Sequence, residues 1–159
     1  MSAEWRFLIT LNDQLRPLRD PVRIQEVALH LIGEHLHASR VNVTQVDDDE
    51  LGSITCYSDA CRRGETVVVS DVETDPRLTI AEREQLLAHE TVAFVGAPLI
   101  KDGRWVATFG VRSAEPRSWT RDQIALVEVT AERTWGVGEG PALRRPKAVA
   151  RAGRRSCAA

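Results

Sequence analysis

The chain has 159 residues, of which 43% are hydrophobic and 28% charged, a composition typical of one soluble globular domain. No apolar run approaches the roughly 20 residues that a transmembrane helix needs, and the N-terminal residues lack the order of a signal peptide. These absences exclude a membrane protein and favour the cytoplasm. The three cysteines, Cys56, Cys61 and Cys157, are too few and too unevenly spaced for a disulfide framework, so we expect reduced thiols.

The net charge of −2 is divided unevenly along the chain. Residues 1–140 hold 23 acidic and 15 basic side chains, whereas residues 141–159 hold six basic and no acidic ones. This C-terminal segment has no apolar periodicity and too little apolar surface to offset the entropy of ordering it. We therefore expect a folded domain over residues 1–135 and a basic, disordered tail over residues 136–159. The tail lacks interleaved aromatic residues, so we expect neither nucleic acid nor a membrane as its partner.

Two helices are predicted at the N-terminus. Apolar residues at spacings of three and four predict a helix over residues 4–15, which ends before Pro17. A second helix is predicted to begin after Asp20, a favourable N-cap, with Pro21 in its first position. This helix carries an apolar stripe as far as Leu36, and such a stripe must pack on another element.

Residues 40–46 alternate two valines with Asn42 and Thr44, which predicts a half-buried strand with these two polar side chains outward. After an acidic loop, residues 54–63 suit a two-turn helix and residues 65–70 suit a strand. Further along, two apolar strands flank the turn Lys101-Asp102-Gly103-Arg104 and predict a hairpin.

Two further helix starts are marked by capping boxes. Thr79 lies three residues before Glu82, and Thr120 lies three residues before Gln123, as the reciprocal capping bonds require. The first of these helices is expected to reach His89, and the second to end near residue 135, before a run of glycines. Strands in a hairpin, with helices before, between and after them, predict an α+β fold built on an antiparallel sheet.

The order of these segments resembles the GAF domain family, a sensory module of bacterial histidine kinases, diguanylate cyclases and transcription regulators. The likeness rests on LNDQLRPLRDPVRIQ at residues 11–25, GETVVVSDVETDPRLTIAERE at residues 64–84 and AFVGAPLIKDGRWVATFGVRSAEPRSWTRDQIALVE at residues 93–128, and it extends over nearly all of residues 3–135. It implies an antiparallel sheet with the N- and C-terminal helices on one face. Short helices and loops would enclose a ligand pocket on the other face, in a GAF/PAS-like arrangement.

The chain departs from the family pattern in two places. Residues 47–53 replace a hairpin of two strands. The loss of this hairpin alters the wall of the implied pocket. Beyond residue 135 the basic tail replaces the coiled-coil linker that would lead to an output domain. These departures leave open that the chain is a degenerate fragment of a longer sensor kinase.

The resemblance places residues 70–89 over the implied pocket, so we expect a small molecule to bind between this segment and the sheet. The candidate ligand-binding residues are Val69, Asp71, Asp75, Arg77, Leu78, His89, Phe94, Ala97 and Phe109. A carboxylate and a guanidinium could meet a polar ligand. The alternative is that Asp71 caps its own loop and Asp75 pairs with Arg77. Alternation alone does not say which face of the sheet Phe94, Ala97 and Phe109 line.

No nucleophile elbow, kinase motif or phosphate-binding loop is found. Signatures for a bilin, a cyclic nucleotide and a metal ion are also missing, so the cofactor is unknown. We therefore expect a non-catalytic, small-molecule-sensing or regulatory GAF domain of bacterial signal transduction, such as a two-component system. It would act on a kinase or another output partner as a homodimer, with Trp5, Leu8 and Trp135 in the interface.

The alternative from another functional class is a thiol-based redox enzyme or sensor. Cys56 and Cys61 lie about one turn apart on the predicted short helix, and a pair of thiols in reach of each other is what such chemistry needs. The residues around them do not resemble the cysteine motifs of the GAF-like methionine sulfoxide reductases.

Overall fold

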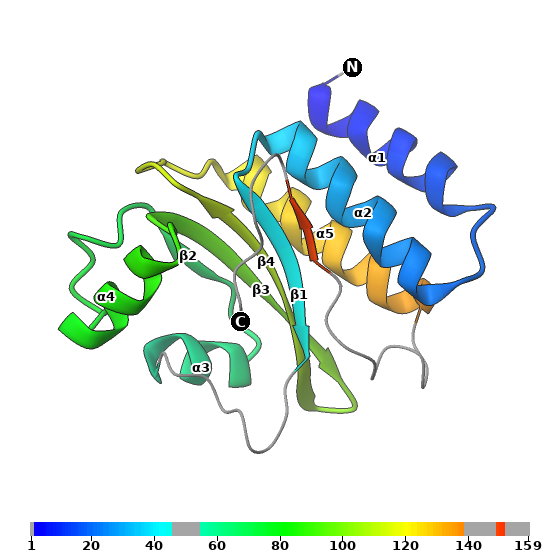
Figure 1. The fold of residues 1–159 in the computed structure, drawn as a ribbon. Helices are drawn as coiled ribbons and strands as arrows, with labels where there is room; N and C mark the ends of the chain where they lie inside the picture. The colour runs from blue at the N-terminus through cyan, green and yellow to red at the C-terminus, as the bar shows by residue number, and fades with distance from the viewer. Residues whose placement is uncertain (1, 46–54, 139–148, 152–159) are drawn as a thin grey trace.

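The computed structural model describes residues 2–45, 55–138 and 149–151, and Figure 1 shows their arrangement. The elements are α1 (Ala3–Leu15), α2 (Pro21–Leu36), β1 (Arg40–Gln45), α3 (Thr55–Arg62), β2 (Val67–Val69), α4 (Ile80–Ala88), β3 (Ala93–Lys101), β4 (Arg104–Ser113), α5 (Arg121–Gly138) and β5 (Val149–Arg151). Among the helices of the described residues, none combines the length and the apolar character needed to cross a membrane.

The strands form one antiparallel sheet in the order β2-β3-β4-β1-β5. The predicted hairpin joins β3 to β4, with Lys101 opposite Arg104. Its two turn residues, Asp102 and Gly103, have φ angles of 53° and 76°. Two-residue hairpin turns require such positive angles, and Asp-Gly adopts them readily. This turn therefore helps to fix the register of the two central strands.

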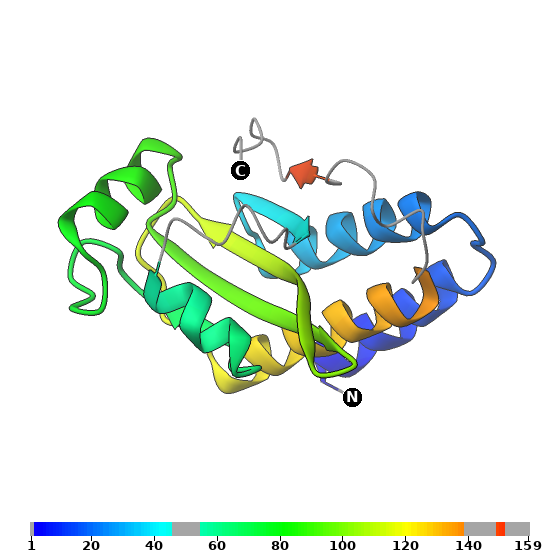
Figure 2. The ribbon, with the colours of Figure 1, turned by 90° about the horizontal axis from the view of Figure 1, so that it is seen from below.

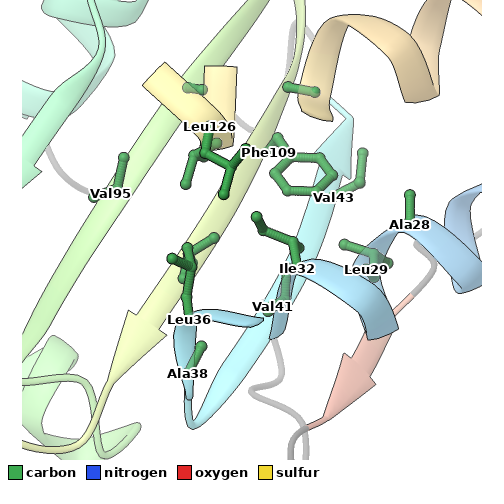
Figure 3. Packing of buried hydrophobic residues seen from close by; sticks show 14 of the residues in the cluster. Ala28, Leu29, Ile32, Leu36, Ala38, Val41, Val43, Val95, Phe109 and Leu126 are labelled. Atoms are coloured by element: carbon green, nitrogen blue, oxygen red, sulfur yellow. The ribbon is translucent and has the colours of Figure 1, made fainter. Parts of the chain in front are cut away.

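The sheet separates two layers of helices. α1, α2 and α5 cover one face, and α3 and α4 lie on the other (Figures 1 and 2). The larger core fills the first side, where Ile32 of α2 and Leu126 of α5 approach Phe109 of β4 (Figure 3). A smaller apolar cluster lies on the second side and comprises Cys61, Val67, Val69, Val72, Leu78, Leu86 and Phe94. The predicted α+β architecture is confirmed.

Local capping signals set the helix starts as predicted. The Asp20 side chain accepts from the Val22 backbone N–H at 3.1 Å, and Pro21 is the first residue of α2. In the α4 capping box, Thr79 Oγ1 accepts from the Glu82 N–H at 3.1 Å, and Glu82 Oε1 accepts from the Thr79 N–H at 2.9 Å. Thr120 and Gln123 make the same two bonds at the start of α5.

Two features of the C-terminal part differ from the sequence-based expectation. α5 continues to Gly138, beyond the end predicted near residue 135. Within the tail expected to be disordered, Val149–Arg151 forms β5 beside β1. An edge strand offers unpaired backbone groups to any extended segment, which apolar periodicity does not report. The replaced hairpin at residues 47–53 and the rest of the tail lie outside the described residues.

Candidate functional site

The charged candidates Asp71, Asp75 and Arg77 lie between β2 and α4 and bond within the protein. Asp71 Oδ1 accepts from the Glu73 backbone N–H at 3.0 Å. Asp75 accepts from Arg77 Nε at 3.0 Å and from Nη2 at 2.6 Å, and the hydrogen bonds from Arg77 hold the pKa of Asp75 below its ordinary value. Arg77 Nη2 also donates to the Val68 carbonyl oxygen at 2.7 Å. These contacts tie the segment to itself and to β2.

The apolar candidates Val69, Leu78 and Phe94 lie together in the smaller cluster, where they are almost fully buried. His89 follows α4 and is half-buried, and its carbonyl oxygen accepts from Arg40 Nη1 at 2.8 Å. These four residues are therefore brought to the side of the sheet that carries α3 and α4.

Ala97 and Phe109 do not belong with the other candidates. They are opposite each other on β3 and β4, and both lie in the larger core against α1, α2 and α5. Phe109 is fully buried and Ala97 is 2% exposed. Since successive residues of a strand point to opposite faces, their place in this core puts them on the side away from residues 70–89. Both are corrected from ligand-binding candidates to core residues.

A row of polar side chains crosses β1 and β4 on the α3/α4 face, and sequence reasoning missed it. We call it the polar row; its members are Arg40, Asn42, Thr44, Thr108 and Arg112. Val41 and Val43 lie in the larger core, so the alternate residues of β1 face the other side. The register pairs Arg40 with Arg112 and Thr44 with Thr108 across the strands.

The ends of the polar row are held by neighbouring elements. Besides its bond to His89, Arg40 has its Nη2 3.6 Å from Glu90 Oε2. Arg112 Nη1 lies 3.4 Å from Thr91 Oγ1, which accepts from it. At the other end, Thr108 Oγ1 accepts from Trp105 Nε1 at 2.9 Å.

Asn42, in the middle of the polar row, is buried with an incomplete set of hydrogen bonds. Its Nδ2 donates to Thr44 Oγ1 at 2.8 Å, whereas its Oδ1 is buried and has no hydrogen-bond partner in the described part of the protein. The residue opposite is Gly110, and a Cβ added there would lie 3.2 Å from Asn42 Oδ1. Glycine at this position thus leaves room for the carboxamide. We predicted from the sequence that the Asn42 side chain points outward, to solvent. This prediction is wrong, because the residue is only 9% exposed.

The sequence contains part of the information needed to predict the polar row. Arg40, Asn42 and Thr44 alternate with valines, and Thr108 and Arg112 alternate with the core residues of β4. This pattern shows that the strands have a polar face. It does not show that α3 and α4 cover that face, because the covering helices come from elsewhere in the sequence.

Cys61 of α3 is a fully buried free thiol beside Thr108. Burial raises the pKa of the Cys61 thiol to about 11, against a hydrogen bond from Thr108 that lowers it. A thiol nucleophile needs a depressed pKa and access to its substrate, and Cys61 has the opposite properties. The side chain of Cys56, also on α3, lies outside the described residues.

The three candidate interface residues differ in exposure. Trp5 on α1 is 55% exposed, and Ile9, one turn further along α1, is 40% exposed. Leu8 and Trp135 are half-buried and pack against the larger core. The outer face of α1 therefore presents an apolar pair to solvent.

Comparison with known proteins identifies one family. The sequence model of the GAF domain matches residues 15–136. No curated protein sequence matches the chain. Among solved structures, the GAF domain of the cyanobacteriochrome TePixJ is similar with a TM-score of 0.65 and 22% identity, over 77% of this chain and 91% of that one.

Two other solved structures are similar at lower identity. The free methionine-R-sulfoxide reductase from Neisseria meningitidis, in complex with its substrate, gives a TM-score of 0.69 and 17% identity over 89% of this chain and 90% of that one. The GAF domain of the Acinetobacter phosphoenolpyruvate-protein phosphotransferase gives a TM-score of 0.68 and 11% identity over 86% of this chain and 93% of that one. At these identities the likeness establishes the fold.

Proposed function

Because the chain belongs to the GAF domain family, a family of signalling and sensor domains, we propose that it is a non-catalytic regulatory domain that binds a small molecule. The ligand lies on the α3/α4 face of the sheet, over the polar row. The observation that carries this proposal is the buried Asn42 Oδ1, which lacks a hydrogen-bond partner among the described residues. The ligand is unidentified, and the feature we assign to it is an N–H or O–H group that donates to this oxygen.

In the absence of a ligand, the buried Asn42 Oδ1 without a partner lowers the stability of the protein. A buried acceptor without a partner costs about 1–3 kcal/mol of stability, and the large majority of such groups in folded proteins are paired. A ligand that donates to Asn42 Oδ1 removes this cost on binding. Binding can shift a signalling equilibrium only through a difference in affinity between two conformations, and a polar group that is satisfied in only one of them provides such a difference.

We expect Asn42→Leu to retain or increase stability while it abolishes ligand binding. Leucine has a similar size and removes the unpaired oxygen, so the free energy of unfolding should rise by about 0–2 kcal/mol after loss of the Thr44 bond. Urea denaturation measures this change, and thermal shift with small molecules that carry hydrogen-bond donors measures binding. Thr44→Val is the control that removes the bond but keeps the Asn42 oxygen. A loss of more than 1 kcal/mol in Asn42→Leu would mean that the carboxamide is satisfied in the native protein.

The non-catalytic part of the proposal is supported by Cys61. Its buried position and raised thiol pKa oppose the redox alternative in which Cys56 and Cys61 act together. A free thiol in the core also suits a reducing compartment, so we place the domain in the cytoplasm.

We further propose that the domain acts as a homodimer that regulates a kinase or another signalling output partner. The exposed pair Trp5 and Ile9 on α1 supports an interface on the outer face of this helix, because aromatic residues often dominate interface energies.

Trp5→Glu is therefore expected to weaken the dimer by about 2 kcal/mol, or roughly 30-fold in dissociation constant. Sedimentation velocity at micromolar concentration measures the change. Ile80→Glu is a matched control, because Ile80 is 72% exposed and lies on α4, away from α1. A native chain that sediments as a monomer at this concentration would contradict the dimer proposal.

A further inference from the structure

Two glycines lie side by side in the middle of the sheet, next to Asn42. The register pairs Asn42 of β1 with Gly110 of β4, and Gly110 with Gly96 of β3. On the far side of Gly96, its partner in β2 is Val67. The neighbours of the two glycines along their own strands all lie in the larger core: Val95, Ala97, Phe109 and Val111. Alternation therefore assigns both glycine positions to the α3/α4 face of the sheet.

We call these two positions, Gly96 and Gly110, the glycine strip. Both residues are buried, and α3 and α4 lie on this side of the sheet (Figure 2). Because neighbouring strands are about 4.8 Å apart, the strip spans most of the roughly 14 Å between β1 and β2. Glycine inside a strand weakens the strand, and it often marks a place where a ligand approaches the backbone closely.

Side chains border the glycine strip on both sides along β3 and β4. Phe94 is the register partner of Arg112 on one side, and Pro98 is the partner of Thr108 on the other. Each border lies two residues from the glycines, which is about 6.7 Å along a strand. The strip is thus a flat area of backbone between two pairs of side chains, with Asn42 at one end and Val67 at the other.

The Asn42 carboxamide is directed at the glycine strip. A Cβ added to Gly110 would lie 3.2 Å from Asn42 Oδ1, and the three heavy atoms nearest to that position all belong to Asn42. Asn42 is only 9% exposed, and its Oδ1 has no hydrogen-bond partner in the described part of the protein. A buried acceptor therefore faces an area of the sheet that has no side chains.

We propose that the ligand of this domain is a flat molecule, about two fused rings in size, that lies across the glycine strip. One edge carries the N–H or O–H group that donates to Asn42 Oδ1. The opposite end is apolar, because it meets Val67 of the smaller apolar cluster. A flat ring keeps contact with the backbone of both central strands, whereas a puckered ring does not. This inference rests on the proposed function, since it gives the shape and chemistry of the same ligand.

The first test compares three small molecules with the same two-ring lactam skeleton. Carbostyril is flat and has an N–H group, N-methylcarbostyril is flat and has none, and the fully hydrogenated analogue keeps the N–H group on puckered rings. NMR titration of the full chain measures their dissociation constants. We expect N-methylcarbostyril to bind about tenfold more weakly than carbostyril, because it leaves Asn42 Oδ1 unpaired. The puckered lactam should bind at least about fivefold more weakly, because it loses contacts with the strands.

The second test places a methyl group on the glycine strip. Gly96→Ala should weaken carbostyril binding at least about tenfold, because the methyl group occupies the place of the ring. The midpoint of urea denaturation should stay the same or rise, since alanine costs less than glycine in a strand. Gly110→Ala, beside the Asn42 oxygen, should weaken binding as well. Ile80→Ala is the control, because Ile80 is 72% exposed on α4, and it should leave the affinity within about twofold.

The other explanation of the glycine strip is that it only makes room for the helices that cover the sheet. Gly96→Ala would then lower the midpoint of denaturation markedly, and this result would overturn the inference. Unchanged carbostyril affinity in Gly96→Ala would also overturn it.

The failure of this inference is distinguishable from the failure of the proposed function. Equal affinity for the flat and the puckered lactam, or no binding of carbostyril at millimolar concentration, would overturn only the flat ligand. The ligand that the domain carries from the cell is detected independently, as an additional mass in native mass spectrometry. Equal carbostyril affinity in the native protein and Asn42→Leu would overturn both the flat ligand and the site at Asn42.

Discussion

Phe109→Ala is expected to lower the free energy of unfolding by about 3–5 kcal/mol. Phe109 is fully buried in the middle of β4, and its ring lies among aliphatic side chains of α2, α5 and β1 (Figure 3). Its removal loses the transfer free energy of the ring and leaves a cavity that the surrounding helices fill only in part. Urea denaturation of the native protein and the variant measures the change.

The control for this substitution is Ile80→Ala. Ile80 is also a large apolar residue, but it is 72% exposed on α4, so its truncation should change stability by no more than about 0.5 kcal/mol. A cost below 1 kcal/mol for Phe109→Ala, together with altered ligand binding, would contradict the core assignment. It would instead favour the first prediction from sequence, that Phe109 lines the ligand pocket.

The Cys61 thiol is expected to be inert in the native protein. Burial raises its pKa to about 11, so at pH 8 only about one molecule in a thousand carries the thiolate, roughly a hundredfold less than for an ordinary thiol. In the variant Cys56→Ser/Cys157→Ser, native Cys61 should react with iodoacetamide at least about 100-fold more slowly than in urea. Rapid labelling of the native variant would restore the redox alternative.

The same pKa shift predicts a loss of stability at alkaline pH. The unfolded chain loses the thiol proton near the ordinary pKa of 9.0, whereas the folded chain keeps it up to about 11. The unfolded state thus binds fewer protons between these values, and the free energy of unfolding falls by about 2–3 kcal/mol as the pH rises through them. The difference between the native protein and Cys61→Ala, measured by urea denaturation from pH 8 to 11, isolates this contribution.

Most of the fold could be predicted because its signals are local. Asp20 with Pro21 marks the start of α2, Thr79 with Glu82 the start of α4, and the Asp102-Gly103 pair the central hairpin. Each of these signals depends on hydrogen bonds or dihedral angles within a few residues. They are therefore readable in one sequence without knowledge of the tertiary structure.

The site was harder to predict because it depends on contacts between distant segments. Ala97 and Phe109 alternate with their neighbours in the same way as Phe94, and only the packing of α1, α2 and α5 decides which face is the larger core. Asn42 was expected outward because α3 and α4, which cover its face, follow later in the chain. β5 carries no periodic signal, and its place results from an edge that β1 leaves available.

Native mass spectrometry tests the central claim, that this domain binds a small molecule at Asn42, most directly. The intact mass under gentle conditions is compared with the denatured mass, for the native protein and for Asn42→Leu, both purified from the same cells. We predict that the native protein carries the additional mass of a small molecule. This mass is lost on denaturation and is missing from Asn42→Leu. Equal masses under both conditions for the native protein, or the same additional mass on Asn42→Leu, would contradict the claim.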